Sequence, residues 1–360
     1  MKKQGAGMKV IVIGAGLGGL TLAQGLRQAG IDVAVYERDG AMGRAQGVSL
    51  HVDDRGASAL RGCLPSAHAA MIDATMGGLR TQTLSVSEVD GSLAVVDGQP
   101  SAARPGRQTH RPLLRAVLLT DLEDAVHFGA EFTRFERQAD GTVKVWCADD
   151  RTDTADVLVG ADGIGSAVRR QYLPQARVVD SGQRMLMGAT PLRSAAGLPD
   201  LIGHNPAVAR VRDKTMVLGA LRFTSPPAVA RQRLLPALSH SVVASVEDYL
   251  MWALPTTQEP PDLPPVLRRV VDDAWPEMTS TLRIGTIPPV PAWPASPVTV
   301  LGDAIHLARG FGGNLAMQDA HRLRDALIEA DRGRVDLIEA INAYEDTMRA
   351  SAPVPVKASA

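Results

Sequence analysis

The chain has 360 residues and a mass of 38.1 kDa, which is enough for two domains at the usual ~100–200 residues each. Charged residues make up 21% and hydrophobic residues 45% of the chain, a composition that excludes disordered and fibrous classes. With 38 basic and 39 acidic residues, the formal net charge is −1. The protein therefore lacks the positive electrostatic field of most proteins that bind nucleic acids or anionic membranes. We therefore expect a small-molecule partner, no nucleic acid and no membrane.

The predicted elements begin with a buried strand over Met8–Ile13, a run of β-branched apolar residues that ends at a glycine. A helix follows from Leu17 to Ala29, where Gly30 supplies the stop. A second strand over Ile31–Tyr36 completes a βαβ unit. Such a unit opens a doubly wound parallel sheet, whose ligand binds at the carboxyl ends of the strands.

A glycine-rich motif lies between the first strand and the first helix. It has the G-x-G-x-x-G pattern and consists of Gly14, Ala15, Gly16, Leu17, Gly18 and Gly19. Its glycines let the backbone approach a pyrophosphate at the positive end of the helix, and Glu37, at the end of the second strand, can accept hydrogen bonds from a ribose. The strand, helix and acid together favour dinucleotide binding over a merely glycine-rich helix start.

Two later segments repeat the pattern of a short buried strand that ends at a turn containing glycine or aspartate. Short apolar strands are predicted at 155–161, running into Asp162, and at 298–301, running into Gly302 and Asp303. Helices are predicted from about Asn314 to Ala330 and from Asp336 to Ala350. Short strand-like pieces at 83–89 and 93–96, and alternating runs at 216–223 and 242–250 broken by prolines, indicate a mostly antiparallel sheet.

The predicted fold class is therefore α/β: a Rossmann-like nucleotide-binding domain with an inserted, mostly antiparallel β-sheet substrate domain. We assign residues 8–79, 109–178 and 285–350 to the first domain, and 80–108 and 179–284 to the second. Residues 1–7 are expected to be a mobile extension and 351–360 a tail.

The cysteines and the amino terminus give no sign of export. Cys63 and Cys147 lie far apart, and neither they nor the eight histidines show metal-ligand spacing, so no disulfide framework and no metal are expected. The apolar run Val10–Ala23 follows two lysines like a secretory signal, but it has only 14 residues and four of them are glycine. We expect a cytoplasmic protein.

Three motifs, in order along the chain, resemble one family. The glycine motif is followed by Gly160-Ala161-Asp162-Gly163, similar to the Asp-Gly signature of class A FAD-dependent monooxygenases, and by Gly302-Asp303-Ala304-Ile305-His306, similar to that family's second FAD fingerprint. The resemblance covers essentially the whole chain. The nearest types are the p-hydroxybenzoate and salicylate hydroxylases and the tetracycline-inactivating monooxygenases.

The resemblance implies which residues bind FAD. The glycine motif would face the pyrophosphate, Glu37 the adenosine ribose, and Asp303 the ribityl or pyrophosphate oxygens; Arg111 would reach the flavin side. The remaining implied cofactor residues are Arg38, Arg44, Gly47, Asp162, Gly302, Gly312, Gly313 and Asn314. For the substrate pocket, between the FAD domain and the antiparallel sheet, we predict Met185, Met187, Leu218, Phe223 and Met251.

The segment Leu307–Gly313 departs from the family pattern. It contains no proline and is about three residues shorter than the family's loop beside the flavin ring. If the shorter loop admits water, oxidation of NAD(P)H should be poorly coupled to oxygen transfer and should release hydrogen peroxide. His306, just before it, belongs to the turn fingerprint and has no identifiable partner acid in the sequence, so we do not assign it as a catalytic base. No catalytic residue is identified from the sequence.

The resemblance implies that NADPH or NADH transiently binds and reduces the flavin, and that O2 forms a C4a-hydroperoxide that oxygenates an aromatic or polycyclic substrate. Two alternatives stay open: a degenerate relative that binds flavin or a hydrophobic small molecule without turnover, and a flavin reductase that does not oxygenate. The sequence does not identify the substrate, the reductant or the oligomeric state.

Overall fold

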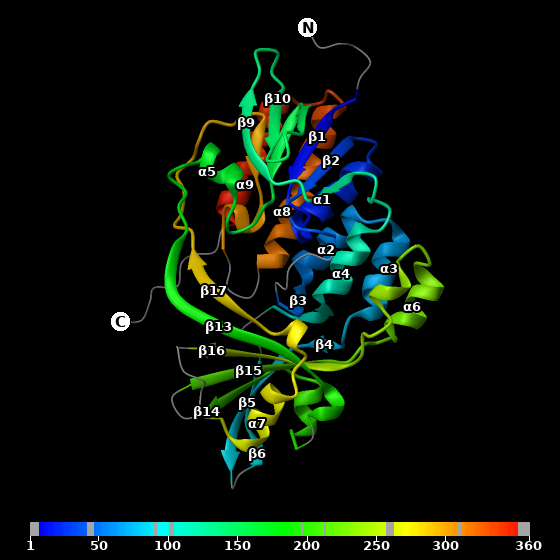
Figure 1. Cartoon of the computed structure of the whole chain (residues 1–360), viewed down its shortest axis with the longest axis vertical. Coiled ribbons are helices and arrows are strands. Elements are labelled where there is room, and N and C mark those ends of the chain that lie inside the picture. Colours follow the sequence, from blue (N-terminus) through cyan, green and yellow to red (C-terminus); the bar gives the residue numbers. More distant parts are fainter. Residues whose placement is uncertain are drawn as a thin grey trace.

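The computed structural model describes residues 7–41, 47–89, 92–100, 104–195, 197–211, 214–256, 263–307 and 312–351. In these residues the chain forms a parallel sheet with helices and a separate large, mostly antiparallel sheet (Figure 1). The predicted α/β fold class is thus confirmed. None of the described helices is long and apolar enough to cross a membrane.

The parallel sheet has five strands in the order β18-β12-β1-β2-β8. Its central strand, β1, pairs on one side with β2, placing Ile13 opposite Tyr36, and on the other with β12, placing Ile13 opposite Gly160. The carboxyl ends of β1, β2 and β12 therefore meet at one edge. The strands are β1 (Lys9–Ile13), β2 (Asp32–Glu37), β8 (Val126–Phe128), β12 (Val157–Gly160) and β18 (Val298–Val300).

Helices pack around this sheet, and the first helix, α1, packs extensively against the long helix α8. Glycines make the close approach possible: a Cβ on Gly18 would lie 3.1 Å from the Ala316 Cβ and 2.7 Å from a methyl of Leu301. The helices of this half are α1 (Leu17–Gln28), α2 (Asp54–Cys63), α3 (Ser66–Thr75), α4 (Arg111–Leu119), α5 (Ala167–Tyr172), α8 (Gly312–Asp331) and α9 (Leu337–Ala350).

The large sheet has seven strands in the order β17-β13-β16-β15-β14-β5-β6. All neighbours are antiparallel except β14 and β5. The long strand β13, itself part of this sheet, curves from beside α5 toward the other strands (Figure 1). The strands are β5 (Gln82–Val89), β6 (Ser92–Pro100), β13 (Val179–Pro191), β14 (Ala207–Val211), β15 (Lys214–Leu221), β16 (Tyr249–Thr256) and β17 (Ser280–Thr286). Helix α7 (Pro265–Asp272) packs against this sheet, whereas α6 (Pro227–Leu234) packs against α3 of the other half.

Two three-stranded sheets complete the fold. One contains β9 (Phe132–Arg137), β10 (Val143–Cys147) and β11 (Thr152–Ala155). The other pairs β7 (Gly106–His110) with β3 (Ser49–Asp53) and β4 (Leu79–Arg80). Of the segment 80–108, β5 and β6 therefore join the large sheet, whereas its two ends, at β4 and β7, belong to this smaller sheet.

The alternating run at 242–250 is a strand only at its end. Tyr249 is the first residue of β16, and it pairs with Pro191 of β13 and Leu221 of β15, the last residues of those strands. Residues 242–248 lie beyond the ends of both neighbours and have no strand to pair with. The strand prediction there was wrong because alternation alone does not reveal where the partner strands stop.

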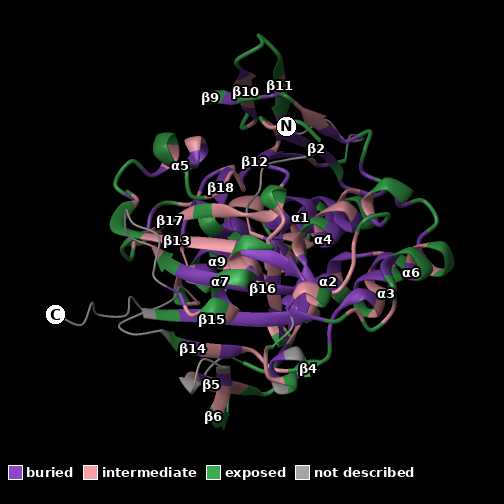
Figure 2. Ribbon diagram, turned by 60° about the horizontal axis from the view of Figure 1, so that its bottom comes forward, coloured by how far each residue is buried: buried purple, intermediate pink, exposed green. Residues whose placement is uncertain are grey.

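Buried side chains form one large core around the parallel sheet and a second within the antiparallel sheet (Figure 2). A third, small cluster contains Val48, Ala189, Leu221 and Tyr249, and it joins the chain just before β3 to the antiparallel sheet. Both cysteines are buried and unlinked.

Glu345 of α9 is a buried acid behind the parallel sheet. Thr299 Oγ1 donates to its Oε1 at 2.8 Å, and burial raises its pKa from 4.5 to about 7. The folded state thus binds this proton more tightly than the unfolded state does. The free energy of unfolding therefore falls as pH rises from about 4.5 through 7, because the buried Glu345 carboxyl loses its proton in that range.

We therefore expect Glu345→Gln to be more stable than the natural protein at pH 8 by roughly 2–3 kcal/mol, since each pKa unit is worth about 1.4 kcal/mol. At pH 4 the two should differ little. Urea unfolding at both pH values measures this, with the exposed Glu339→Gln on the same helix as control. If the free energy of unfolding had the same pH dependence in Glu345→Gln as in the natural protein, Glu345 would not be the cause of that dependence.

Candidate cofactor and substrate site

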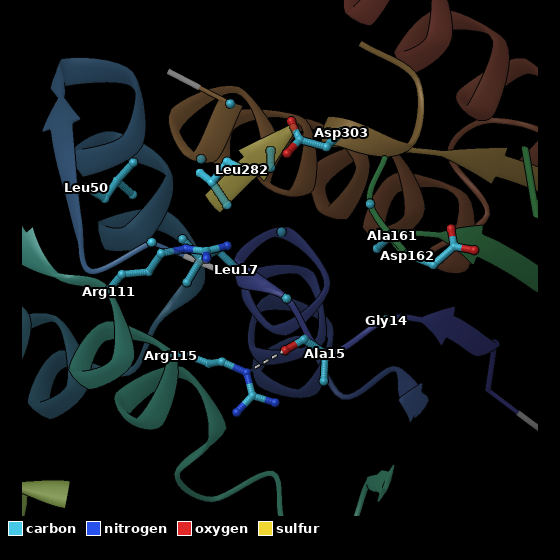
Figure 3. Close-up of a pocket in the computed structure, with 18 of the residues that line it drawn as sticks. Gly14, Ala15, Leu17, Leu50, Arg111, Arg115, Ala161, Asp162, Leu282 and Asp303 are labelled. Atoms are coloured by element: carbon cyan, nitrogen blue, oxygen red, sulfur yellow. Dashed lines mark hydrogen bonds between the residues drawn. The ribbon is translucent and has the colours of Figure 1, made fainter. Parts of the chain in front are cut away.

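A cavity of about 750 Å³ lies where the carboxyl ends of β1, β2 and β12 meet one face of the antiparallel sheet. Most of the predicted cofactor residues line it: Gly14, Ala15, Gly16, Leu17, Gly18, Glu37, Arg38, Gly47, Arg111, Asp162, Gly302, Asp303, Gly312 and Gly313. Segments far apart in the chain are therefore brought to one cavity (Figure 3).

Three of the four motif glycines, Gly14, Gly16 and Gly19, have different structural roles. Gly14 has a φ of +109° and a Cβ there would lie 2.5 Å from the Ala161 carbonyl oxygen. A Cβ on Gly19 would lie 2.0 Å from the Gly14 carbonyl oxygen, so Gly19 sets the helix against the strand and does not line the cavity. A Cβ on Gly16 would meet nothing within 4 Å. Gly16 therefore leaves space rather than permitting a close contact within the protein.

The amino terminus of α1 opens into that space. Its N-cap is Gly16, and no side chain caps it. The first N–H groups of a helix have no partners within the helix and carry the positive end of its dipole. Uncapped N–H groups beside an open glycine form a suitable binding place for the phosphates of a nucleotide.

Glu37 lies beside this loop at the end of β2. Its Oε2 accepts from the Ala15 N–H at 2.8 Å and its Oε1 from the Asp39 N–H at 2.9 Å. Each carboxylate oxygen has a further lone pair for a ligand hydroxyl. The sequence prediction did not include Arg115, one helical turn after Arg111 on α4, whose Nε donates to the Ala15 carbonyl at 3.0 Å (Figure 3).

Asp303 and Arg111 place opposite charges on the cavity wall (Figure 3). Asp303 follows Gly302, whose φ is +59°, in a short 3₁₀ turn after β18. Its side chain is accessible from the cavity, yet surrounding protein raises its carboxyl pKa, an effect that the charge of Arg111 opposes. Burial likewise lowers the pKa of Arg111, opposed by Asp303. The two groups would favour polar, hydrogen-bonding ligand atoms between them.

Asp162 follows β12 and caps the next helix. Its Oδ2 accepts from the Ala167 N–H at 2.6 Å at the start of α5. Burial raises the pKa of its carboxyl. Asp162 therefore shapes the Asp-Gly turn as well as lining the cavity.

Asn314, in contrast, is fully buried behind the cavity. Its Oδ1 accepts from the Asp53 N–H at 3.0 Å and its Nδ2 donates to the His51 carbonyl at 2.7 Å, so it fastens α8 to β3. Arg44 lies outside the described residues. So does most of the shortened loop, residues 308–311.

Of the predicted substrate residues, the three methionines Met185, Met187 and Met251 line the cavity. Leu218 and Phe223 do not, and this corrects the prediction. Successive strand residues point to opposite faces: Val217 faces the cavity, whereas Leu218 is buried in the core of the antiparallel sheet.

Phe223 lies beyond the end of β15 and packs against the buried ring of Tyr249, with 6.5 Å between ring centroids. Among the cavity residues that the sequence prediction did not include are Ser49, Leu50, Gln108, Met278 and Leu282.

His306 has a partner acid that could not be found from the sequence. Its Nε2 lies 2.6 Å from Asp319 Oδ2, which also accepts from the Gly302 N–H at 3.0 Å. Burial alone would lower the pKa of His306, but the hydrogen bond and the charges of Asp319 and Asp303 raise it overall. His306 does not line the cavity, so the pair supports the Gly302–Asp303 turn rather than facing a substrate.

The comparisons with known proteins agree with one another. The model of a family described as "FAD binding domain" matches residues 7–215. An FAD-dependent urate hydroxylase from Klebsiella pneumoniae is 30% identical, over 94% of this chain and 85% of that protein. The dual O-methyltransferase/FAD-dependent monooxygenase elcB from Phaeosphaeria nodorum is 28% identical over 88% of this chain but only 40% of its own length.

The chain thus spans less than half the length of the first curated relatives. Among solved structures, a Photorhabdus luminescens protein assigned as an FAD-containing monooxygenase has a TM-score of 0.79 and 28% identity. The match covers 95% of this chain and 94% of the other.

Proposed function

Because the chain belongs to the FAD-binding-domain family that FAD-dependent monooxygenases share, we propose that it oxygenates an aromatic or polycyclic small molecule with NAD(P)H and O2. One observation carries the proposal: the nucleotide-binding loop and an apolar wall of methionines line the same cavity. In the balanced reaction, NAD(P)H, a proton, O2 and the substrate would yield NAD(P)⁺, water and the hydroxylated product.

FAD is the cofactor of this family, and the residues present suit it. The uncapped start of α1, with the open side of Gly16, would receive the pyrophosphate. Glu37 would accept from the adenosine ribose, and Asp303 and Arg111 would lie beside the ribityl chain and the flavin. We assign the same cofactor-binding role to the other cavity-lining residues predicted from the family motifs. When bound, FAD would supply the redox chemistry, for which the family resemblance implies a hydroperoxide route.

The protein itself would orient the substrate and exclude water from one side of the cavity. Met185, Met187 and Met251, with Leu282 and Met278, give the antiparallel-sheet side of the cavity a flexible apolar surface. Urate, the compound for which the Klebsiella relative is named, carries polar atoms around both rings. The methionine wall suits a less polar ring system, so we propose a largely apolar aromatic substrate. The 8–79, 109–178 and 285–350 segments would bind FAD, and 80–108 and 179–284 the substrate.

The test is substrate-stimulated oxidation of NAD(P)H by the FAD-loaded protein. We expect a screen of aromatic compounds to find some that accelerate NAD(P)H consumption and become hydroxylated. A protein that binds flavin without turnover would show no acceleration by any compound. A flavin reductase would consume NAD(P)H and reduce its substrate without using O2. NAD(P)H consumption and oxygen uptake, measured together, therefore separate the three functions.

We expect Asp303→Ala to weaken FAD binding by about tenfold to a hundredfold, since a hydrogen bond to a charged group is worth roughly 1.5–3 kcal/mol. The positive φ of this turn is at Gly302 and not at Asp303, so we expect circular dichroism to match the natural protein. Fluorescence titration of the apoprotein with FAD measures the affinity. Asp149→Ala, in an exposed turn, is the control. Unchanged affinity in Asp303→Ala would remove Asp303 from the site.

A further inference from the structure

A buried arginine lies just behind the substrate side of the cavity. Arg80, at the end of β4, is only 6% exposed. Its Nη1 donates to Gln108 Oε1 at 2.8 Å and its Nη2 to the Ala220 carbonyl. Among the described residues no carboxylate forms an ion pair with it. Burial lowers the pKa of its guanidinium only to about 10, so the group is charged at neutral pH.

The polar groups around Arg80 are neutral. Gln108 Nε2 donates to Ser49 Oγ, and the Tyr249 hydroxyl lies 3.1 Å from His110 Nδ1. Burial raises the pKa of Tyr249 far above its usual value and lowers that of His110 to about 4. At neutral pH this network of five side chains therefore carries one net positive charge and no negative one.

The network reaches the cavity at Ser49 and Gln108, both of which line it. Arg80 itself comes close: a Cβ on Gly219 would lie 3.3 Å from Arg80 Nη1 and 3.5 Å from the Met251 methyl, and Met251 lines the cavity. The Gln108 amide and the glycine at 219 lie between the cation and this side of the cavity. Its lining includes Gln183 and the exposed Glu277 as well as the methionine and aliphatic side chains.

A buried charge without a counter-charge destabilises a protein, and an apolar side chain of similar volume would stabilise it more. The buried positive charge destabilises the protein less when an anion binds to the same network. Gln108 Nε2 has a second N–H, and the Ser49 hydroxyl can also donate. The cavity thus offers neutral donors polarised by a cation that lies one hydrogen bond behind Gln108 and two behind Ser49.

We infer that Ser49 and Gln108 form a polar subsite for an anionic oxygen of the substrate, a carboxylate, phenolate or enolate on an otherwise apolar ring system, with Arg80 as the positioning residue that supplies the counter-charge. This inference rests on the proposed function, in that it treats this part of the cavity as the substrate side. Reduced flavin is also a planar anion, and the experiment separates that source from the substrate.

The experiment measures equilibrium binding to the FAD-loaded protein by the change in flavin absorbance. The probes are 2-naphthoate and 2-naphthamide, which have the same rings but differ in charge. We expect the natural protein to prefer the naphthoate by about tenfold to a hundredfold. Arg80→Met should abolish that preference while naphthamide binding stays unchanged, and Arg80→Lys should restore part of it.

The control is Arg107→Met on the neighbouring strand β7. Arg107 lies 3.6 Å from Asp73 and does not line the cavity, so its loss should leave the preference intact. Gln108→Glu is a second variant in case Arg80→Met does not fold. It places a carboxylate against Arg80 and neutralises the network from within, and it should therefore also abolish the preference for naphthoate.

Several results would overturn the inference. One is a natural protein that binds naphthoate no better than naphthamide, or not at all. Another is an equal loss of affinity for both probes in Arg80→Met, which would indicate that Arg80 acts only through packing. A third is an unchanged preference with a lowered flavin midpoint potential, which would make the flavin the partner anion. Because binding is measured without turnover, the inference can hold even if no oxygenation is found.

Discussion

Replacing Gly16 by valine is expected to abolish FAD binding while leaving the fold intact. Gly16 has a φ of −81° and a ψ of −176°, an extended conformation that any residue can adopt, and its Cβ would meet nothing within 4 Å. The side chain would instead fill the space in front of the uncapped helix N–H groups. Loss of two or more charge-assisted hydrogen bonds corresponds to at least about a hundredfold in affinity.

The neighbouring glycines provide the matched contrast. At Gly14 and Gly19 a Cβ would lie 2.5 Å and 2.0 Å from carbonyl oxygens, so Gly14→Ala and Gly19→Ala should lower the thermal midpoint of the apoprotein, whereas Gly16→Val should not. FAD retained after gel filtration and circular dichroism melting measure the two effects. If Gly16→Val kept its FAD, or if FMN competed equally with FAD, the assignment of the α1 terminus to the pyrophosphate would be wrong.

The second large effect is expected from Asp319→Ala. Asp319 is buried in α8, and its Oδ2 accepts from both His306 Nε2 and the Gly302 N–H. Removing it leaves a buried imidazole and a buried N–H without their acceptor. Breaking a buried charged pair in this way costs about 3–5 kcal/mol, and the Gly302–Asp303 turn should loosen with it.

The pH dependence of this loss follows from the raised pKa of His306. Its stabilising effect is fully present below the unfolded value of about 6.5 and is lost as pH rises through the folded pKa. Asp319→Ala should therefore cost more at pH 6 than at pH 9 in urea unfolding of the apoprotein. Asp325→Ala, exposed on the same helix, should cost little at either pH. A loss independent of pH would mean that the pair is uncharged.

Local patterns were enough to predict that the motif residues assigned to the cofactor share one cavity. The glycine motif, Glu37 and the Gly302–Asp303 turn are each set by a strand end and the helix or turn that follows, so sequence spacing is enough to place them on one cavity edge. Arg115 could have been predicted as well, because it lies four residues after Arg111 on one face of α4.

The substrate side depends on information that spacing does not carry. Leu218 and Val217 have the same apolar character, and only the pairing of β15 with its neighbours decides which of them faces the cavity. The polar subsite is still less accessible to sequence reasoning. Ser49, Arg80, Gln108 and Tyr249 come from four different strands, and neither spacing nor charge pattern connects them.

The central claim, that this cavity oxygenates a small molecule with FAD and O2, is tested most directly with isotopic oxygen. The FAD-loaded protein would be incubated with NAD(P)H, ¹⁸O2 and a compound that stimulates NAD(P)H oxidation, and the product analysed by mass spectrometry. We expect one ¹⁸O atom per product molecule, and none when the label is supplied as H2¹⁸O. A product that forms without ¹⁸O from O2, or NAD(P)H oxidation that yields only hydrogen peroxide with every compound, would contradict the account.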